Sequence, residues 1–290
     1  MSASSIGGLL QQARRRLAVA GCEQPGLDAR LLLQAAAGIS HTEIAASPEQ
    51  VIDGTAREVF DSYIARREGC EPVSRILGSR EFYGRSFAVT PAVLDPRADT
   101  ETLIGAALEV LKPGDLILDL GTGSGAIILT LLTERPGTSG VATDRSAAAL
   151  AVARANALDF GLAGRVAFAE GDWFEPVTGA FDIIVSNPPY IRDGDIAGLA
   201  PDVRNFDPWA ALAGGADGLD AYRRIAEGAT AHLAAGGLVL LEIGAGQADG
   251  VAAIFGRNGF ERDAAVKDLG GHVRCLSFVP RAAACGHSGN

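Results

Sequence analysis

The chain has 290 residues, of which 48% are hydrophobic and 21% charged, and its formal net charge is -10. This length allows one large domain or two smaller ones, and the composition is typical of a soluble globular protein and argues against a disordered chain. Residues 1–90 contain ten basic and ten acidic side chains, so residues 91–290 carry the whole acidic surplus, which disfavours a surface that follows nucleic-acid phosphates.

Residues 4–75 are predicted to form a small bundle of helices. Apolar residues recur at three- and four-residue spacing over residues 6–17, and a second helix is expected over residues 28–37. Ser47-Pro48 matches a capping serine followed by proline at the first helical position, so we expect a further helix to begin there. No residue of the bundle is a candidate for catalysis or ligand binding.

The N-terminal stretch does not match a targeting segment. In "RRRLAVAGC" only four apolar residues follow the arginines, whereas a signal peptide needs an apolar core of about 7–15 residues. No run approaches the ~20 apolar residues of a membrane span. The four cysteines are scattered without a Cys-x-x-Cys pair or a histidine at metal-ligand spacing. We therefore expect a cytoplasmic protein with reduced thiols, no membrane segment and no metal site.

From residue 75 onward the spacing of the apolar residues changes from that of helices to that of strands. Residues 75–94 contain short β-rich runs punctuated by glycine, which predicts a hairpin that acts as a linker. Short apolar runs then alternate with amphipathic segments, as expected for buried parallel strands with crossover helices. The last two runs are joined by only Leu-Gly-Gly, which forces antiparallel pairing, and a polar tail at 281–290 is expected to be disordered. The expected strands cover residues 115–120, 140–144, 165–170, 181–186, 237–244, 260–268 and 272–280.

A glycine-rich loop follows the first of these strands. Asp119 ends the strand, and Gly121, Thr122, Gly123 and Gly125 lead into a helix, where a ligand can meet bare backbone. The loop also satisfies the G-x-G-x-x-A pattern, so a nicotinamide dinucleotide is one interpretation. An acidic residue two positions before the first glycine suits a cationic ligand and would repel a pyrophosphate, which favours S-adenosylmethionine.

Two more acidic residues follow the next two strands. Asp144 ends the second strand, where a carboxylate can accept the ribose hydroxyls of either cofactor. Asp172 follows the third strand and can accept an adenine amino group, with Trp173 as a flat wall, although a turn cap and a packed tryptophan explain this pair equally well. A dehydrogenase would need an acid or base near the fourth strand, and none of the histidines lies there in the sequence.

The segment Asn187-Pro188-Pro189-Tyr190 directly follows the fourth strand, whose carboxyl end faces the cofactor in a doubly wound sheet. The side-chain oxygen of Asn187 and the carbonyl of Pro188 can accept the N–H hydrogens of a planar nitrogen, and Tyr190 can border it. Such a site needs neither metal nor strong base, because alignment supplies much of the catalysis. A plain strand-ending turn is the alternative.

Together these motifs resemble those of the HemK/PrmC peptide chain release factor glutamine methyltransferases. The resemblance extends to "SREFYG", "DPRADTE", "GGADGLDAYRRI", "LEIGAGQ" and "KDLGGHVR", and so covers nearly the whole chain. It implies a helical substrate-recognition domain (1–74), a hairpin linker (75–94) and a class I S-adenosylmethionine-dependent methyltransferase domain (95–280). That domain would be α/β, a Rossmann-like seven-stranded mixed sheet. The implied reaction is methyl transfer from S-adenosyl-L-methionine to N5 of the glutamine in the Gly-Gly-Gln loop of release factors.

The resemblance also implies which residues form the site. Asp95 and Ala98 depart from the family pattern, which usually has isoleucine and proline there, so the departure affects the local rigidity of this segment. The expected catalytic residues are Asn187, Pro188 and Tyr190; the expected substrate contacts are Asn187, Pro188, Pro189, Tyr190 and Arg97; and the expected cofactor contacts are Asp119, Gly121, Thr122, Gly123, Gly125, Asp144, Asp172, Trp173 and Asn187.

An adenine-N6 methyltransferase acting on DNA or RNA is the main alternative, because the same Asn-Pro-Pro-Tyr segment occurs there and a flipped base would stack on Tyr190. Such enzymes carry a basic target-recognition region, which the uncharged balance of residues 1–90 does not provide. A sensor or scaffold without activity would show damaged motifs, whereas Asp144 and Asn187 are in place. We therefore expect a monomeric enzyme that binds release factors and no nucleic acid stably.

Overall fold

The computed structural model describes residues 5–281, and the chain divides into two compact units. Met1–Ser79 and Ala200–Phe206 form the first, which we call the helical unit. Arg80–Leu199 and Asp207–Asn290 form the second, which we call the sheet unit. The tail predicted to be disordered lies, from residue 282 on, outside the described residues.

The helical unit is held together by one apolar core. Its helices are α1 (Ile6–Val19), α2 (Pro25–Ala37), α3 (His41–Ala46), α4 (Gly54–Glu68), α5 (Val73–Leu77) and α9 (Pro201–Phe206). Leu17, Leu32 and Phe60 come from α1, α2 and α4 and are fully buried, as the helical spacing of the apolar residues predicts. Gly38 ends α2 in the left-handed conformation that favours glycine.

The helix predicted at Ser47-Pro48 does not begin there. Ser47 ends α3 instead, because its N–H donates to the carbonyl of Glu43 at 3.0 Å. The next helix, α4, begins at Gly54, where the carboxylate of Asp53 accepts the N–H of Ala56 at 2.9 Å. An aspartate cap six residues further on thus determines the start of the helix, and the Ser-Pro pair belongs to the preceding turn.

The predicted linker is divided between the two units. Its helical turn, α5, belongs to the helical unit. Its hairpin, β1 (Ser79–Phe82) and β2 (Arg85–Ala88), turns at Tyr83 and Gly84, which both have positive φ as in a two-residue hairpin turn. Phe82 and Phe87 are buried in the core of the sheet unit, so the hairpin is packed rather than a free connection.

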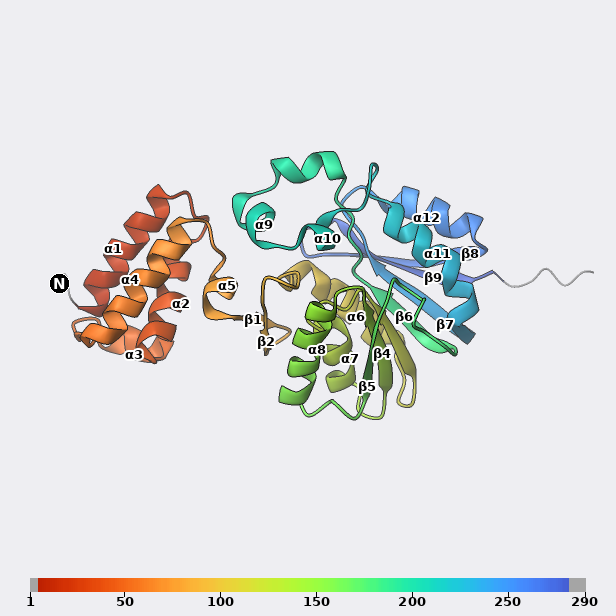
Figure 1. Cartoon of the computed structure of the whole chain (residues 1–290), viewed down its shortest axis with the longest axis horizontal. Helices are drawn as coiled ribbons and strands as arrows, with labels where there is room; N and C mark the ends of the chain where they lie inside the picture. Colours follow the sequence, from red (N-terminus) through yellow and green to blue (C-terminus); the bar gives the residue numbers. More distant parts are fainter. Residues whose placement is uncertain (1–4, 282–290) are drawn as a thin grey trace, which may run out of the picture. The chain divides into compact units, whose positions relative to one another are not determined.

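A seven-stranded mixed sheet forms the centre of the sheet unit, in the order β5-β4-β3-β6-β7-β9-β8 (Figure 1). The strands are β3 (Leu116–Leu120), β4 (Ser139–Asp144), β5 (Val166–Glu170), β6 (Phe181–Ser186), β7 (Leu233–Glu242), β8 (Phe260–Lys267) and β9 (Val273–Pro280). The pairs from β5 to β7 are parallel, and β9 is antiparallel to both β7 and β8. The predicted mixed α/β sheet is confirmed, including the pairing of the fourth strand, β6, with the first, β3.

Helices cover both faces of this sheet. The helices of the sheet unit are η1 (Ala98–Thr100), α6 (Glu101–Val110), α7 (Ala126–Glu134), α8 (Ala147–Asp159), η2 (Asp193–Gly198), α10 (Trp209–Leu212), α11 (Asp220–His232) and α12 (Ala248–Arg257), and of these α6, α7, α8, α11 and α12 pack on the sheet. Neighbouring residues Ile117 and Leu118 of β3 enter different apolar cores, because successive side chains of a strand point to opposite faces. The first core includes residues of α6, α7 and α8, and the second includes residues of α11 and α12.

Among residues 5–281, no helix combines the length and the apolar character that crossing a membrane requires.

Candidate methyl-transfer site

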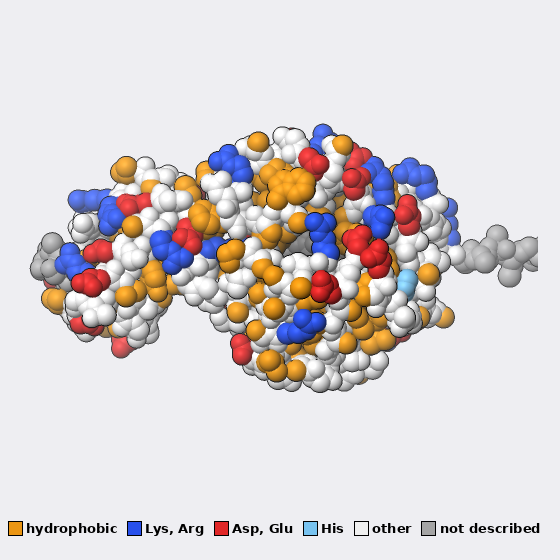
Figure 2. All heavy atoms as spheres, viewed as in Figure 1, with side chains coloured by type: hydrophobic (Ala, Val, Ile, Leu, Met, Phe, Trp, Pro, Cys, Tyr) orange, Lys and Arg blue, Asp and Glu red, His pale blue; other side chains and the backbone are white. Residues whose placement is uncertain are grey.

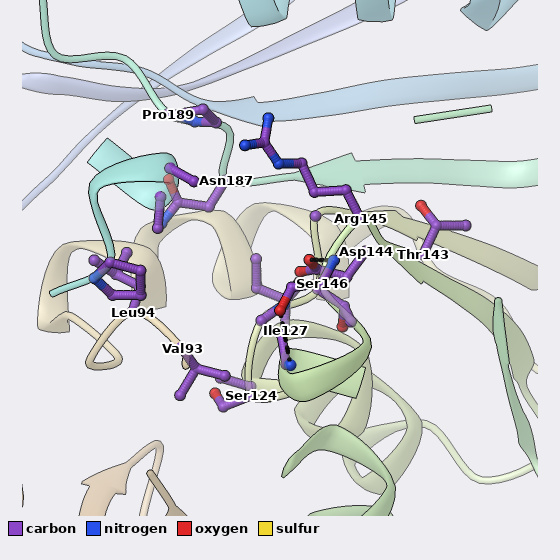
Figure 3. Close-up of a pocket in the computed structure, with 18 of the residues that line it drawn as sticks. Val93, Leu94, Ser124, Ile127, Thr143, Asp144, Arg145, Ser146, Asn187 and Pro189 are labelled. Carbon is purple, nitrogen blue, oxygen red and sulfur yellow. Dashed lines mark hydrogen bonds between the residues drawn. The ribbon is translucent and has the colours of Figure 1, made fainter. Parts of the chain in front are cut away.

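A cavity of about 240 Å³ lies in the sheet unit at the carboxyl ends of the parallel strands. Gly121 follows β3, Asp144 ends β4, Asp172 follows β5 and Asn187 follows β6, and all four line the cavity. Figure 3 shows Asp144 and Asn187 at this cavity. The strand order changes direction between β3 and β6, and this is where open α/β sheets bind their ligands. The topology therefore brings together residues from four separate motifs.

The glycine loop presents backbone to this cavity. Gly121, Gly123 and Gly125 have φ values of 72°, 56° and 81°, a region that residues with a side chain rarely adopt. The N–H groups of Gly121 and Thr122 both donate to the carbonyl of Thr143 at 2.9 Å, which ties the loop to the end of β4. Gly125 then begins α7, so the positive end of that helix lies behind the loop.

Asp144 is fixed by two backbone donors. Its Oδ2 accepts the N–H of Gly123 at 3.0 Å, and its Oδ1 accepts the N–H of Ser146 at 2.9 Å (Figure 3). A carboxylate has about four acceptor positions, so these two bonds leave capacity for hydroxyl groups of a ligand. Arg145, which was not predicted as a site residue, also lines the cavity, and its guanidinium extends toward Pro189 (Figure 3).

Asp172 and Trp173 form the wall that follows β5. Both line the cavity, and Oδ2 of Asp172 accepts a hydrogen bond from Arg224 at 3.2 Å. Trp173 has a positive φ of 52°, which is unusual for a bulky residue, and its carbonyl accepts the hydroxyl of Thr143 at 3.2 Å. Its ring also packs against the second apolar core. The turn thus holds an aromatic ring at the cavity in a strained conformation.

Asp119 does not lie where its position in the sequence predicted. It is fully buried and is not among the residues that line the cavity, and its Oδ2 accepts the hydroxyl of Thr122 at 2.6 Å. Burial raises the pKa of Asp119 to about 7. Thr122, not Asp119, reaches the cavity. Asp119 therefore supports the glycine loop from behind through Thr122.

The Asn-Pro-Pro-Tyr segment is also divided. Asn187 and Pro189 line the cavity, whereas Pro188 and Tyr190 lie outside its lining. The Nδ2 of Asn187 donates to Oγ1 of Thr100 at 3.1 Å, which directs its nitrogen toward η1 and leaves its oxygen as a possible acceptor. Burial raises the pKa of Tyr190 to about 12, so its phenol is neutral at physiological pH.

An ion pair between the partly exposed Arg97 and the buried Asp207 lies at the cavity. Arg97 lines the cavity and pairs with Asp207, whose carboxylate also accepts the N–H of Asp95 at 3.4 Å. The next residue, Pro208, lines the cavity as well. Arg97 was predicted as a site residue and Asp207 was not, because no local pattern marks an ion-pair partner so distant in the chain.

Two glycine-rich motifs, "GGADGLDAYRRI" and "LEIGAGQ", were assigned no role from the sequence, and residues of both pack against the backbone at Tyr190. A Cβ on Gly214 would lie 2.8 Å from the carbonyl oxygen of Pro189, and one on Gly218 would lie 2.5 Å from that of Tyr190. The Nε2 of Gln247 donates to the carbonyls of Tyr190 at 2.9 Å and Gly218 at 3.2 Å. These contacts fix the backbone that follows Asn187 and its prolines.

Solved structures similar to this chain are methyltransferases. A methyltransferase from Pyrococcus furiosus matches with a TM-score of 0.53 and 20% identity, and covers 69% of this chain and 91% of its own. A ribosomal protein L11 methylase from Lactobacillus delbrueckii subsp. bulgaricus matches with a TM-score of 0.50 and 20% identity, and covers 70% of this chain and 89% of its own. At this identity the likeness establishes the fold alone, a Rossmann-like α/β domain.

Sequence comparisons are more specific. Residues 8–78 match the PrmC N-terminal domain, and residues 99–200 match the methyltransferase small domain. The release factor glutamine methyltransferase of Rhodospirillum rubrum is 48% identical and covers 97% of this chain and 87% of its own length. That of Cereibacter sphaeroides is 47% identical and covers 92% of this chain and 96% of its own length. The chain therefore belongs to the release factor glutamine methyltransferase family.

Proposed function

We propose that this protein transfers a methyl group from S-adenosyl-L-methionine to the side-chain N5 of the glutamine in the Gly-Gly-Gln loop of peptide chain release factors. One observation carries the proposal: Asn187 lines the cavity at the switch point of a methyltransferase sheet with its nitrogen already bonded to Thr100. An amide oxygen that faces the cavity can accept an N–H of a second amide. The family membership supports glutamine as the owner of that amide.

The cavity fits the cofactor. Asp144 has two acceptor positions left for the ribose hydroxyls, and Asp172 and Trp173 offer an acceptor and a flat wall for the adenine. The exposed backbone of Gly121 and Gly123 admits the amino acid part of the molecule without side-chain obstruction. When bound, the cofactor supplies an electrophilic methyl group on a positively charged sulfur.

The residues that follow β6 hold and orient the acceptor nitrogen. An amide nitrogen is a poor nucleophile because its lone pair is delocalised, so acceptors on its N–H hydrogens both place it and return electron density to it. Asn187, which lines the cavity, supplies one acceptor. The family resemblance assigns the second acceptor to the carbonyl of Pro188 and the border of the planar group to the neutral ring of Tyr190, which both adjoin lining residues. Arg97 lies at the substrate side of the cavity, held by Asp207.

We propose further that the enzyme works in the cytoplasm as a monomer and binds no nucleic acid stably. Its substrate would act on ribosomes, and the formal net charge of -10 opposes binding to phosphates. On the face shown in Figure 2, basic and acidic side chains of the described residues are interspersed and form no extended basic area. Light scattering of the protein alone measures its oligomeric state, and light scattering with DNA measures nucleic-acid binding. A dimer or a DNA complex at physiological salt would contradict the proposal.

The decisive experiment incubates the protein with methyl-labelled S-adenosylmethionine and each of four acceptors. These are a release factor, its Gln→Ala variant in the Gly-Gly-Gln loop, duplex DNA and single-stranded DNA. We expect label only on the intact release factor. Label on DNA but not on the release factor would support the adenine-N6 alternative and overturn the proposal.

A further inference from the structure

The direction of the Asn187 amide decides whether it can accept a hydrogen bond from a substrate. An asparagine side chain carries an acceptor oxygen on one side and a donor nitrogen on the other. If the amide rotated by half a turn, two N–H groups would face the N–H groups of the substrate and repel them. Whatever holds this amide in one direction therefore determines whether the site works.

Thr100 holds the nitrogen side. Its hydroxyl accepts from Nδ2 of Asn187 at 3.1 Å, and the residue is only 5% exposed. A hydroxyl can also donate its own hydrogen to the oxygen of an amide, in which case the asparagine would be reversed. The direction of Asn187 therefore depends on where the hydrogen of Thr100 goes.

A buried carboxyl group lies next to both side chains. Glu242 is the last residue of β7, and β6 and β7 pair in register with Ser186 opposite Leu241, so Glu242 and Asn187 follow neighbouring positions. Glu242 is 1% exposed, and burial raises the pKa of its carboxyl group, while the side chains of Thr100 and Asn187 lie near enough to oppose that rise. Its Oε2 has no hydrogen-bond partner within the described chain, so the group is incompletely solvated.

We propose that Glu242 is a positioning residue whose ionised carboxylate takes the hydrogen of Thr100 and thereby turns the oxygen of Asn187 toward the cavity. The order of donors is then amide nitrogen to hydroxyl, and hydroxyl to carboxylate. A protonated Glu242 can donate to Thr100 instead, which frees the hydroxyl to donate to the asparagine oxygen and removes that acceptor from the substrate. The inference rests on the proposed function, because it gives that same site its working state.

The groups around Glu242 set the pH at which its carboxyl group gains or loses a proton, and this pH is near neutral. Burial raises the pKa of Glu242 to about 7, and the nearby side chain of Thr100 and the charge of Arg274 oppose this rise. Arg274, on β9, is itself bonded to Asp268 and paired with Asp99, both at 3.0 Å. The other titratable groups that face Glu242 are Tyr190, Tyr222 on α11 and Cys275 on β9.

The protonation of Glu242 determines whether turnover rises or falls with pH. Glu242 is ionised above about pH 7 and protonated below it. Turnover should therefore rise with pH through this range and then level off, whereas binding of the cofactor, for which Asp144, Asp172 and the glycine loop provide most contacts, should change little.

The first test compares Glu242→Gln with the wild type and with Glu261→Gln, a control on the exposed face of β8. We measure kcat on a release factor from pH 6 to 9, and the dissociation constant of S-adenosylmethionine at each pH. The expected result for Glu242→Gln is a loss of about tenfold or more in kcat at pH 8, no rise of kcat through pH 7, and a cofactor affinity within about threefold of wild type. A variant with wild-type kcat and an unchanged pH profile would overturn the proposal.

A second test remains decisive if Glu242→Gln fails to fold. Thr100→Ser keeps the hydroxyl and Thr100→Val removes it at similar volume. We expect the serine variant to retain the wild-type pH profile and the valine variant to lose it. Equal behaviour of the two would contradict the relay through the hydroxyl.

A third measurement needs no substrate and so separates this inference from the proposed function. The side-chain amide resonances of Asn187, assigned by their absence in Asn187→Ala, should shift with pH around 7 in the wild type and not in Glu242→Gln. If the amide shifts in this way but the release factor is not methylated, the proposed function fails while the switch stands. A constant resonance from pH 6 to 9 would refute the switch whatever the substrate is.

Discussion

In the proposed reaction, Asn187 has one function that no neighbour can take over: its oxygen accepts a hydrogen bond from the substrate amide. Asn187→Ala removes this acceptor without altering Asp144, Asp172 or the glycine loop. We expect kcat on a release factor to fall by about 10²-fold or more, as when a single oriented group at a reaction centre is lost. Calorimetry should show an unchanged affinity for S-adenosylmethionine. Unchanged turnover would mean that the acceptor site has been misassigned.

Asp119 makes the folded protein less stable as the pH rises. Its pKa is about 7 in the folded chain, because burial opposes ionisation, and near its ordinary value of 3.8 when unfolded. A raised pKa of this kind contributes stability that is fully present below the unfolded value and is lost as the pH rises toward 7, at a rate of ~1.4 kcal/mol per pH unit.

Asp119→Asn removes this titration and leaves an oxygen for the hydroxyl of Thr122. Relative to wild type, the variant should therefore gain thermal stability between pH 5 and pH 8. Glu242 titrates in the same direction, but it is present in both proteins and cancels in the comparison. A difference in Tm that stays constant with pH would contradict the assignment.

Individual side chains show the limit of what the sequence could predict at this scale. Asp144 and Asp119 both lie at or near the end of a parallel strand, and the sequence assigned both to the ligand. The structure places one beside the cavity and the other beneath the loop. Position along a strand predicts the edge of the sheet that a residue reaches, but not which side of the following loop its carboxylate occupies. Glu242 was missed for a related reason, since its partner Thr100 lies on a distant segment.

Among the connecting elements, the segment around Gly214 is expected to control the geometry of the site. A Cβ there would lie 2.8 Å from the carbonyl oxygen of Pro189 and 2.9 Å from Cα of Tyr190, and both are backbone atoms that cannot rotate away. Gly214→Ala should therefore displace the segment after Asn187. Gly198, in η2, is a matched control, because a Cβ on it would have no atom within 4 Å.

We expect Gly214→Ala to lower kcat by about tenfold or more and to cost about 1–3 kcal/mol in stability, as overpacking does. Gly198→Ala should stay within ~0.5 kcal/mol and keep wild-type turnover. Steady-state kinetics together with denaturant unfolding measure both effects. Equal activity of the two alanine variants would show that the packing of Gly214 does not matter for catalysis.

Most elements were predictable because each carries its own pattern. The five buried parallel strands are short continuous apolar runs, and the two antiparallel strands follow them. All seven strands were located, although β7 begins at Leu233 rather than at residue 237. Two of the differences show why the rest could not be predicted. The start of α4 depended on a choice between two caps, Ser47 and Asp53, that the sequence leaves open. The assignment of Ala200–Phe206 to the helical unit depends on contacts between distant parts of the chain, which no local pattern encodes.

At the scale of the whole molecule, the two units have separate apolar cores, although the chain passes between them three times, at residues 79–80, 199–200 and 206–207. All residues that line the cavity belong to the sheet unit. A ligand that binds only the folded sheet unit stabilises it by RT ln(1 + [L]/Kd), which is ~2.7 kcal/mol at a hundredfold excess over Kd. The helical unit gains nothing from these contacts.

We therefore expect hydrogen exchange to slow on addition of S-adenosylmethionine in the sheet unit, most strongly in residues 119–125, 143–149 and 171–174. Exchange in α1, α2 and α4 should stay unchanged, because their core shares no residue with the cavity. Adding a release factor should then slow exchange in the helical unit if that unit recognises the substrate, as proposed from the resemblance. Protection of α1 and α4 by the cofactor alone would mean that the two units are energetically coupled and that cofactor binding prepares the helical unit for its partner.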